Sequence, residues 1–206
     1  MDSLLTVTVA ASGATAFDLT TLSDVKADLS ITGASDDVIL ARYITESSLQ
    51  FARACNRDFA RETVSEQYRP EESKALLIVT RRPVVSITSI AEDGTALTVS
   101  DWETDLPAGL IYRLRSDYRC WWMAAKIVVV YVAGHTLPAE APADLQKAAR
   151  ALVKAQWLSK GRDPLVRNEA VPGVYEVAYW VGGLPGGSSW PAEIEAAIAA
   201  YRNPLV

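Results

Sequence analysis

Histidine and cysteine are scarce in this sequence of 206 residues, and their scarcity excludes several kinds of chemistry. His135 is the only histidine, so a metal site with several histidine ligands cannot form, and no Gly-x-Ser-x-Gly motif makes it part of a catalytic triad. Cys55 and Cys120 are the only cysteines, far apart and without CxxC spacing. Such thiols form neither a zinc site nor a disulfide framework, so we predict two small buried residues in a reducing compartment.

The sequence also lacks long apolar runs and clusters of basic residues. No stretch approaches the roughly 18 apolar residues of a membrane span, and no lysine or arginine precedes Lys26, which argues against a signal peptide. The net charge is -5 and the pI is about 5.0, whereas proteins that grip nucleic acid carry clustered lysine and arginine. We therefore expect a cytoplasmic protein with no membrane partner. The acidic balance argues against a protein that grips nucleic acid, but not against one that DNA merely slides past.

Half of the residues are hydrophobic, which suffices for a folded core, and helical periodicity appears early in the chain. Ser23 is the expected N-cap of a short helix that ends at Leu29. A longer helix is predicted from Ser35 or Asp36 to about Asn56. Its inward stripe is expected to contain Leu40, Ile44, Ser47, Phe51 and Cys55.

A third helix is predicted over residues 143–159, and its apolar surface is unusually wide. A helix that is apolar nearly all round must be covered on several sides. In a chain of this size, a neighbouring subunit is a natural cover. We therefore predict a contact between identical subunits made by Leu145, Ala149, Leu152, Val153 and Trp157.

Residues 61–137 differ from the helical segments because they are rich in valine, isoleucine and tyrosine. This composition predicts a small antiparallel β module inserted between helices, with strands at 75–80, 84–90, 110–114 and 126–132. A further short strand is predicted where Leu5, Val7 and Val9 alternate with threonine, followed by a loose arm. The sequence thus predicts an α+β fold.

The last part of the chain combines a predicted linker with a predicted helix. Glycine and proline are frequent up to Ser189, which is typical of a flexible tether. A helix is expected to begin near Pro191, with Ile194, Ile198 and Tyr201 on one face. We interpret it as a short helix on a long tether, and such an arm is suited to reach a partner.

Candidate sites for chemistry are weak. Asp101, Glu103 and Asp105 alternate as in a calcium loop, but Leu106 and Tyr112 stand where that loop needs glycine and glutamate. We predict no catalytic, cofactor or metal site. The alternative is a small hydrolase or transferase whose carboxylates gather around these residues.

Two other clusters leave alternatives open. An aromatic cluster suits either core packing or a protein interface, and it contains Tyr118, Trp121 and Trp122 beside Arg115 and Arg119. A basic stripe suits a solvated or subunit-facing surface, or else a phosphate contact, and it contains Lys147, Arg150 and Lys154 with Lys160 and Arg162 beyond.

Several motifs, taken in order, resemble those of the head–tail connector (adaptor) proteins of tailed phages and gene transfer agents. These are Leu22-Ser-Asp-Val-Lys26-Ala-Asp-Leu29, Asp36-Asp37, Cys55-Asn56-Arg57-Asp58-Phe59, Arg82-Pro83-Val84-Val85-Ser86-Ile87, Tyr131-Val-Ala-Gly134, Pro142-Ala-Asp-Leu145 and Trp190-Pro-Ala-Glu-Ile194 to Tyr201-Arg202-Asn-Pro204. The likeness leaves out residues 161–189. Smaller members of the family lack the β-rich insert.

The resemblance implies a division of the chain into four parts. Residues 1–21 would be an N-terminal strand and arm, and residues 22–60 with 138–160 a helical connector body. Residues 61–137 would be the inserted β module, and residues 161–206 a linker with a tethered C-terminal docking helix. The helices at 36–56 and 143–159 would form the ring body.

The resemblance also implies a structural role in the host cytoplasm during assembly and then in the virion neck. Identical subunits would form a ring, twelvefold if it matches a portal, which extends the DNA channel between the portal protein and a tail-side completion or stopper protein. The helix would dock on the portal through Trp190, Ile194, Ile198, Tyr201 and Arg202. A tail-terminator or tail-tube protein is a further alternative, although those proteins are mainly β.

Overall fold

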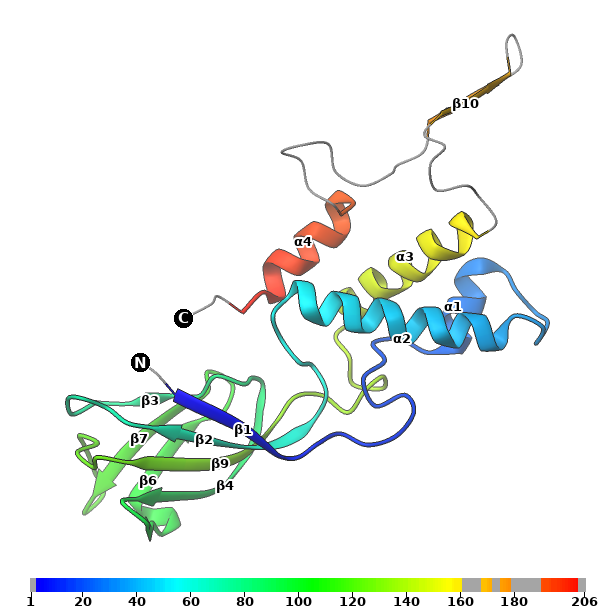
Figure 1. Ribbon diagram of the computed structural model, residues 1–206. Coiled ribbons are helices and arrows are strands. Elements are labelled where there is room, and N and C mark those ends of the chain that lie inside the picture. Colours follow the sequence, from blue (N-terminus) through cyan, green and yellow to red (C-terminus); the bar gives the residue numbers. More distant parts are fainter. Residues whose placement is uncertain (1–2, 161–167, 172–174, 179–189, 204–206) are drawn as a thin grey trace. The chain divides into compact units, whose positions relative to one another are not determined.

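Helical and strand-forming segments separate into two units in the computed structural model, which describes residues 3–160, 168–171, 175–178 and 190–203 (Figure 1). The β unit comprises residues 1–17, 57–140 and 204–206, and the helical unit comprises residues 18–56 and 141–203. The fold is therefore α+β, as predicted. Within the described ranges, no helix has the length and apolar character needed to cross a bilayer.

Two antiparallel sheets form the β unit. The larger has the order β1-β2-β9-β4-β5, with β1 at Ser3–Val9, β2 at Glu62–Tyr68, β9 at Ile127–Ala133, β4 at Val84–Glu92 and β5 at Thr95–Ala96. The smaller has the order β3-β7-β6, with β3 at Leu77–Ile78, β7 at Leu110–Arg115 and β6 at Trp102–Asp105, and β8 at Tyr118–Cys120 pairs with β7. A 3-10 turn at Val99–Asp101 precedes β6.

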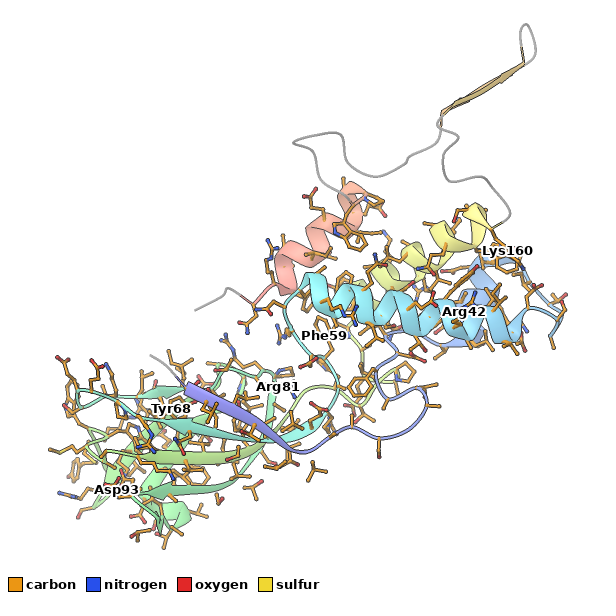
Figure 2. All side chains as sticks on the ribbon, viewed as in Figure 1. Arg42, Phe59, Tyr68, Arg81, Asp93 and Lys160 are labelled. Carbon is orange, nitrogen blue, oxygen red and sulfur yellow. The ribbon has the colours of Figure 1, made fainter. Side chains whose placement is uncertain are left out.

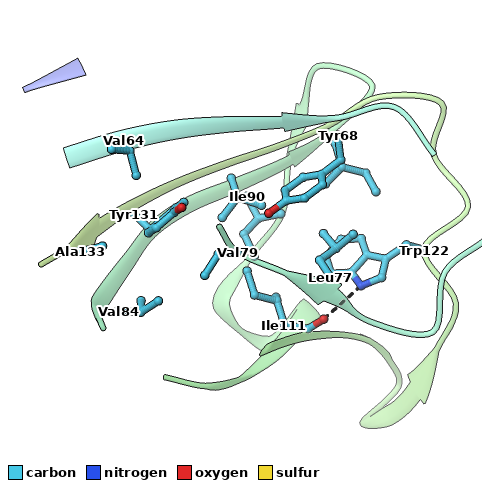
Figure 3. Close-up of a cluster of buried hydrophobic side chains, with 12 residues drawn as sticks. Val64, Tyr68, Leu77, Val79, Val84, Ile90, Ile111, Trp122, Tyr131 and Ala133 are labelled. Carbon is cyan, nitrogen blue, oxygen red and sulfur yellow. Dashed lines mark hydrogen bonds between the residues drawn. The ribbon is translucent and has the colours of Figure 1, made fainter. Parts of the chain in front are cut away.

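The core of the β unit is built from inward side chains of both sheets (Figure 3). Alternation is clear in β9, where every second residue is buried. Trp122 is fully buried in this cluster, and its indole Nε1 donates a hydrogen bond to the Ile111 carbonyl at 3.3 Å. The remaining members of the buried cluster are Val64, Tyr68, Leu77, Val79, Val84, Ile90, Ile127, Val129, Tyr131 and Ala133.

Strand β2 was missed by the sequence analysis because two of its inward positions are glutamates. Glu66 is fully buried, and its carboxylate accepts hydrogen bonds from Ser3 Oγ at 2.5 Å, the Thr80 amide at 3.0 Å and the Tyr131 hydroxyl at 2.7 Å. These donors replace water around a charge that would otherwise be costly to bury. Burial, followed by the charge of Glu66, raises the pKa of Tyr131 above its usual range.

The other inward glutamate, Glu62, forms an ion pair with Arg81, whose guanidinium also contacts Asp58. The predicted strand at 75–80 is shorter in the structure and comprises Leu77–Ile78 alone. The strands predicted at 84–90, 110–114 and 126–132 are confirmed as β4, β7 and β9, each within two residues of the predicted bounds.

Four helices form the described part of the helical unit: α1 at Leu22–Leu29, α2 at Asp37–Ala54, α3 at Ala143–Ser159 and α4 at Ala192–Tyr201. The N-cap of α1 is Thr21, whose Oγ1 accepts from the Asp24 amide at 3.1 Å, so the assignment of Ser23 as the cap was wrong. The predicted inward stripe of α2 is confirmed, because all five of its side chains are buried.

Most of the predicted linker lies outside the described residues. Within it, β10 at Asn168–Val171 pairs with β11 at Tyr175–Ala178 in an antiparallel ladder. This hairpin was not expected, because glycine and proline in the surrounding segment predict an irregular tether.

Candidate assembly surfaces

The wide apolar surface of α3 is covered within the chain itself. Helices α1, α2 and α4 all pack against α3, and Leu145, Ala149, Leu152 and Val153 are buried. Trp157 is half-buried and packs against a cluster that contains Val25, Leu40 and Ile44. The reason for expecting a subunit contact at these five residues therefore no longer holds, because three helices of the same unit supply the cover.

Helix α4 is docked on the helical unit, so the expectation of a freely tethered helix was wrong for the described residues. Ile194 and Ile198 are 2% and 7% exposed. The Tyr201 hydroxyl donates to Asp144 at 2.8 Å, and the amide of Asn203 donates to the Cys55 carbonyl at 2.9 Å. Apolar packing thus fixes one face of α4 to the helical unit, and a backbone hydrogen bond fixes the segment just after its C-terminal end.

The other predicted docking residues are more accessible than the isoleucines. Trp190 and Tyr201 are half-buried, and Arg202 is exposed. An open groove of about 390 Å³ runs between α3 and α4. Its lining combines Ile194 and alanines with charged side chains: Ala148, Ala151, Ala196, Ala197 and Ala200 with Asp144, Lys147 and Glu193. With α4 docked in this way, the alanines and charged side chains of the groove and Arg202 are accessible, whereas Ile194 and Ile198 expose little surface.

The carboxylates at 101–105 do not converge on one point, because each has a different protein partner. Asp101 closes a capping box with Thr98 and lies 3.6 Å from Arg113, and the Thr98 hydrogen bonds lower the pKa of that carboxyl. Glu103 pairs with Arg119 at 2.9 Å, and Asp105 accepts from the Ala108 amide at 3.2 Å. In the part of the chain that the structure describes, no group of three or more potential ligands could hold a metal ion.

His135 lies beside cations rather than beside a nucleophile. Its backbone amide donates to the Phe59 carbonyl at 2.8 Å, which fixes its place at the end of β9. Burial lowers the pKa of the imidazole first, and the positive charge of Arg57 lowers it further, while Glu140 acts in the opposite direction. A neutral, half-buried loop histidine is the result.

Much of the basic stripe is neutralised by carboxylates. Arg150 pairs with Asp28 at 2.8 Å, Lys160 with Asp36 at 3.1 Å, and Lys147 lies 3.8 Å from Glu193. Arg162 lies outside the described residues. Paired cations present little net charge to phosphate. The structure therefore favours the interpretation of this stripe as a solvated surface over its interpretation as a phosphate contact.

The aromatic cluster is divided by the fold. Trp122 belongs to the core, whereas Tyr118, Trp121 and Met123 are 79%, 58% and 82% exposed. Residues Ser116 and Asp117 both have positive φ and form the tight turn between β7 and β8. Beyond this turn, the exposed Trp121 and Met123 line one open surface pocket together with Arg115, and this composition is typical of protein interfaces.

Comparison with known proteins identifies the family. A family model described as head completion protein matches residues 18–160. The chain belongs to the head completion protein family. The match begins at the first residue of the helical unit and ends after α3, so it includes most of both units but neither β1 nor α4.

Solved structures from gene transfer agent particles share the fold over nearly the whole chain. The neck of an empty particle computed with C6 symmetry is 16% identical, with a TM-score of 0.57 over 98% of this chain and 97% of that chain. The neck of a native particle computed with C12 symmetry is 16% identical, with a TM-score of 0.54 and the same coverage. The virion of a native particle gives 15% identity and a TM-score of 0.54. No curated protein sequence matches the chain significantly.

Proposed function

We propose that this chain is a non-enzymatic structural subunit of the head–tail neck of a tailed phage or gene transfer agent. Copies of it would form a ring below the portal, extend the DNA channel and join the capsid to the tail. The observation that carries this proposal is the head completion match over residues 18–160. The fold likeness to gene transfer agent necks, which extends over 98% of the chain, supports it.

The charge of the chain is suited to such a channel. A net charge of -5 repels phosphate over the molecule as a whole, and three cations of the basic stripe are paired. DNA can therefore pass a ring of these subunits without being retained by it. Specific binding of DNA would require free lysine and arginine gathered on one surface.

We propose that the region around α4 contacts the portal through its accessible side. Ile194 and Ile198 are buried where α4 packs on α3, so their role would be to hold the helix in place. Arg202 at the end of the helix and the groove between α3 and α4 would then meet the partner. This differs from the original expectation, in which the isoleucines themselves were the anchors.

The proposal is tested by assembly. Purified full-length protein is measured by light scattering over a range of concentrations and imaged by negative stain, alone and with portal rings from the same particle. We expect rings that co-sediment with portal. Arg202→Glu should weaken co-sedimentation while Arg202→Lys retains it, because the first reverses the charge that exposed Arg202 presents and the second keeps it. A protein that stays monomeric and never joins portal rings contradicts the proposal.

A further inference from the structure

The five-stranded sheet has two edges that no described strand covers. β1 lies at one edge and pairs with β2. At the other edge, β5 pairs with Ala91 and Glu92 of β4, which leaves residues 84–89 without a neighbour on their outer side among the described residues. Edge strands present unpaired backbone N–H and C=O groups that can template pairing with another chain.

Neither edge carries the charges that usually prevent such pairing. Natural proteins protect exposed edges with lysine, inward-pointing charges, proline or β-bulges, and of these devices only bulges occur in β1 and in residues 84–91 of β4. β1 has the sequence SLLTVTV, without charge or proline, and its Leu4 and Val9 are 65% and 61% exposed. Residues 84–91 of β4 are also uncharged, and Val85 is 41% exposed. Both edges therefore offer uncharged backbone, rich in β-branched residues, with which a strand of another chain can pair.

Side-chain hydrogen bonds join β1 and the residues after it to the rest of the sheet, in addition to its backbone pairing with β2, so its outer edge has a defined position. Ser3 Oγ donates to the buried Glu66 carboxylate at 2.5 Å. Thr8 Oγ1 donates to the Thr63 carbonyl at 3.1 Å, and the Ala11 amide donates to Glu62 Oε1 at 3.1 Å. These bonds anchor the strand and the beginning of the segment that the sequence analysis interpreted as a loose arm.

We infer that the β1 edge of one copy pairs with the β4 edge of a second copy, so that the sheets form a continuous belt around the ring. The inference rests on the ring proposed above and names its contact. Each neighbour in the order β1-β2-β9-β4 is antiparallel, so β1 and β4 run in opposite directions.

Rotation about an axis along the strands preserves these directions. The neighbour's β4 therefore meets β1 in the antiparallel sense. Contacts between two different edges repeat from copy to copy and can close a ring. β4 also contains two register irregularities, between Val84 and Ser86 and between Ile87 and Ser89. Such bulges bend a strand and increase its twist, as closure of a sheet requires.

The register supplies a test that distinguishes contacts between copies from contacts within one copy. Thr6, Ser65, Val130 and Ser89 form one row of cross-strand partners, so Thr6 and Ser89 lie on the same face at opposite ends of the row. Three strand spacings of about 4.8 Å place them about 14 Å apart. A disulfide requires Cα atoms within about 7 Å. Cysteines at these two positions can therefore cross-link only between copies.

The experiment uses the full chain with Cys120→Ser and the pair Thr6→Cys/Ser89→Cys, oxidised with copper phenanthroline at high protein concentration. We expect a non-reducing gel to show a ladder extending beyond dimers, which reductant collapses. Thr6→Cys/Ser86→Cys tests a register shifted along the strand, because Ser86 pairs with Val132 on the same face. The matched control is Thr6→Cys/Ala199→Cys, in which the second cysteine is on the exposed side of α4.

The other outcomes show whether the β belt alone fails or the neck function fails with it. Rings in negative stain without cross-linking of either pair beyond the control would refute the β belt and leave the neck function standing. Dimers formed equally by Thr6→Cys alone would show that β1 pairs with β1, which also refutes the belt. Protein that stays monomeric with and without portal, and forms no ladder, contradicts both proposals.

Discussion

Replacing Ile194 by alanine tests whether α4 belongs to the core of the helical unit. The side chain is 2% exposed, and its helix packs on α3. Truncation of a fully buried isoleucine to alanine costs about 2–5 kcal/mol through lost apolar burial and the cavity left behind. With additional support from Ile198 and from the Asn203 amide, we expect a loss of about 3 kcal/mol.

The assay is thermal unfolding of the full chain followed by circular dichroism. For a unit of about a hundred residues, 1 kcal/mol shifts the midpoint by roughly 4–8 °C. The Ile194→Ala variant should therefore melt roughly 12–24 °C below the parent chain in the transition of the helical unit. Val38→Ala is the matched control, because Val38 is also an apolar residue in a helix but is 85% exposed. It should change stability by less than about 0.5 kcal/mol.

Equal melting of Ile194→Ala and Val38→Ala would refute this reasoning. It would mean that α4 contributes nothing to the stability of the free protein and is an arm after all. In that case Ile194→Ala should reduce portal co-sedimentation while the melt stays unchanged. A lower melting temperature with portal binding retained below the transition would instead confirm α4 as part of the body.

Three further predictions concern the β unit. Gly134→Ala should destabilise by about 3 kcal/mol or more, since φ is +100° and a Cβ would lie 2.2 Å from the Ala60 carbonyl oxygen; Gly94→Ala, at φ +90° with open space around it, should cost only about 1–2 kcal/mol in the same melt. Trp121→Ala should leave the melt unchanged because Trp121 is 58% exposed, but should weaken neck assembly measured by co-sedimentation; unchanged assembly would show that the surface of Arg115, Trp121 and Met123 is not an interface. Burial and the charge of Arg57 lower the pKa of His135 below 6.5, so the stability linked to its neutral form is present above pH 6.5 and is lost as the pH falls through the lowered pKa. The His135→Gln variant should therefore lose less stability than the parent between neutral and mildly acidic pH. Equal pH profiles of the two proteins would contradict this prediction.

Local periodicity in the sequence determined the helices. The 17 residues of α3 were predicted from the prolines before them and the apolar residues along them, and the buried stripe of α2 was predicted residue by residue. Both follow from the 3.6-residue repeat, which is a property of neighbours along the chain. β4 and β9 were likewise evident, because β-branched residues dominate them, and β7 was evident from its isoleucine and tyrosine.

Tertiary structure alone decided what covers each apolar surface. The stripe of Ile194 and Ile198 predicts a helix with one apolar face, but it does not say whether that face meets α3 or another protein. β2 could not be predicted from its own residues, because the buried Glu66 is stabilised by hydrogen-bond donors from Ser3, Thr80 and Tyr131, which are distant in sequence.

Adjacent tryptophans show the same limit most directly. Trp121 and Trp122 have equal hydrophobicity and the same sequence surroundings, yet one is 58% exposed and the other is fully buried. Successive residues of an extended chain point to opposite sides, so the path of the backbone past the core decides which ring is buried. That path is set by the pairing of distant segments, such as the bridge between Lys74 and Trp122. The sequence therefore determined which side chains need cover, and the long-range pairing of strands determined which of them the chain covers itself and which it leaves for a partner.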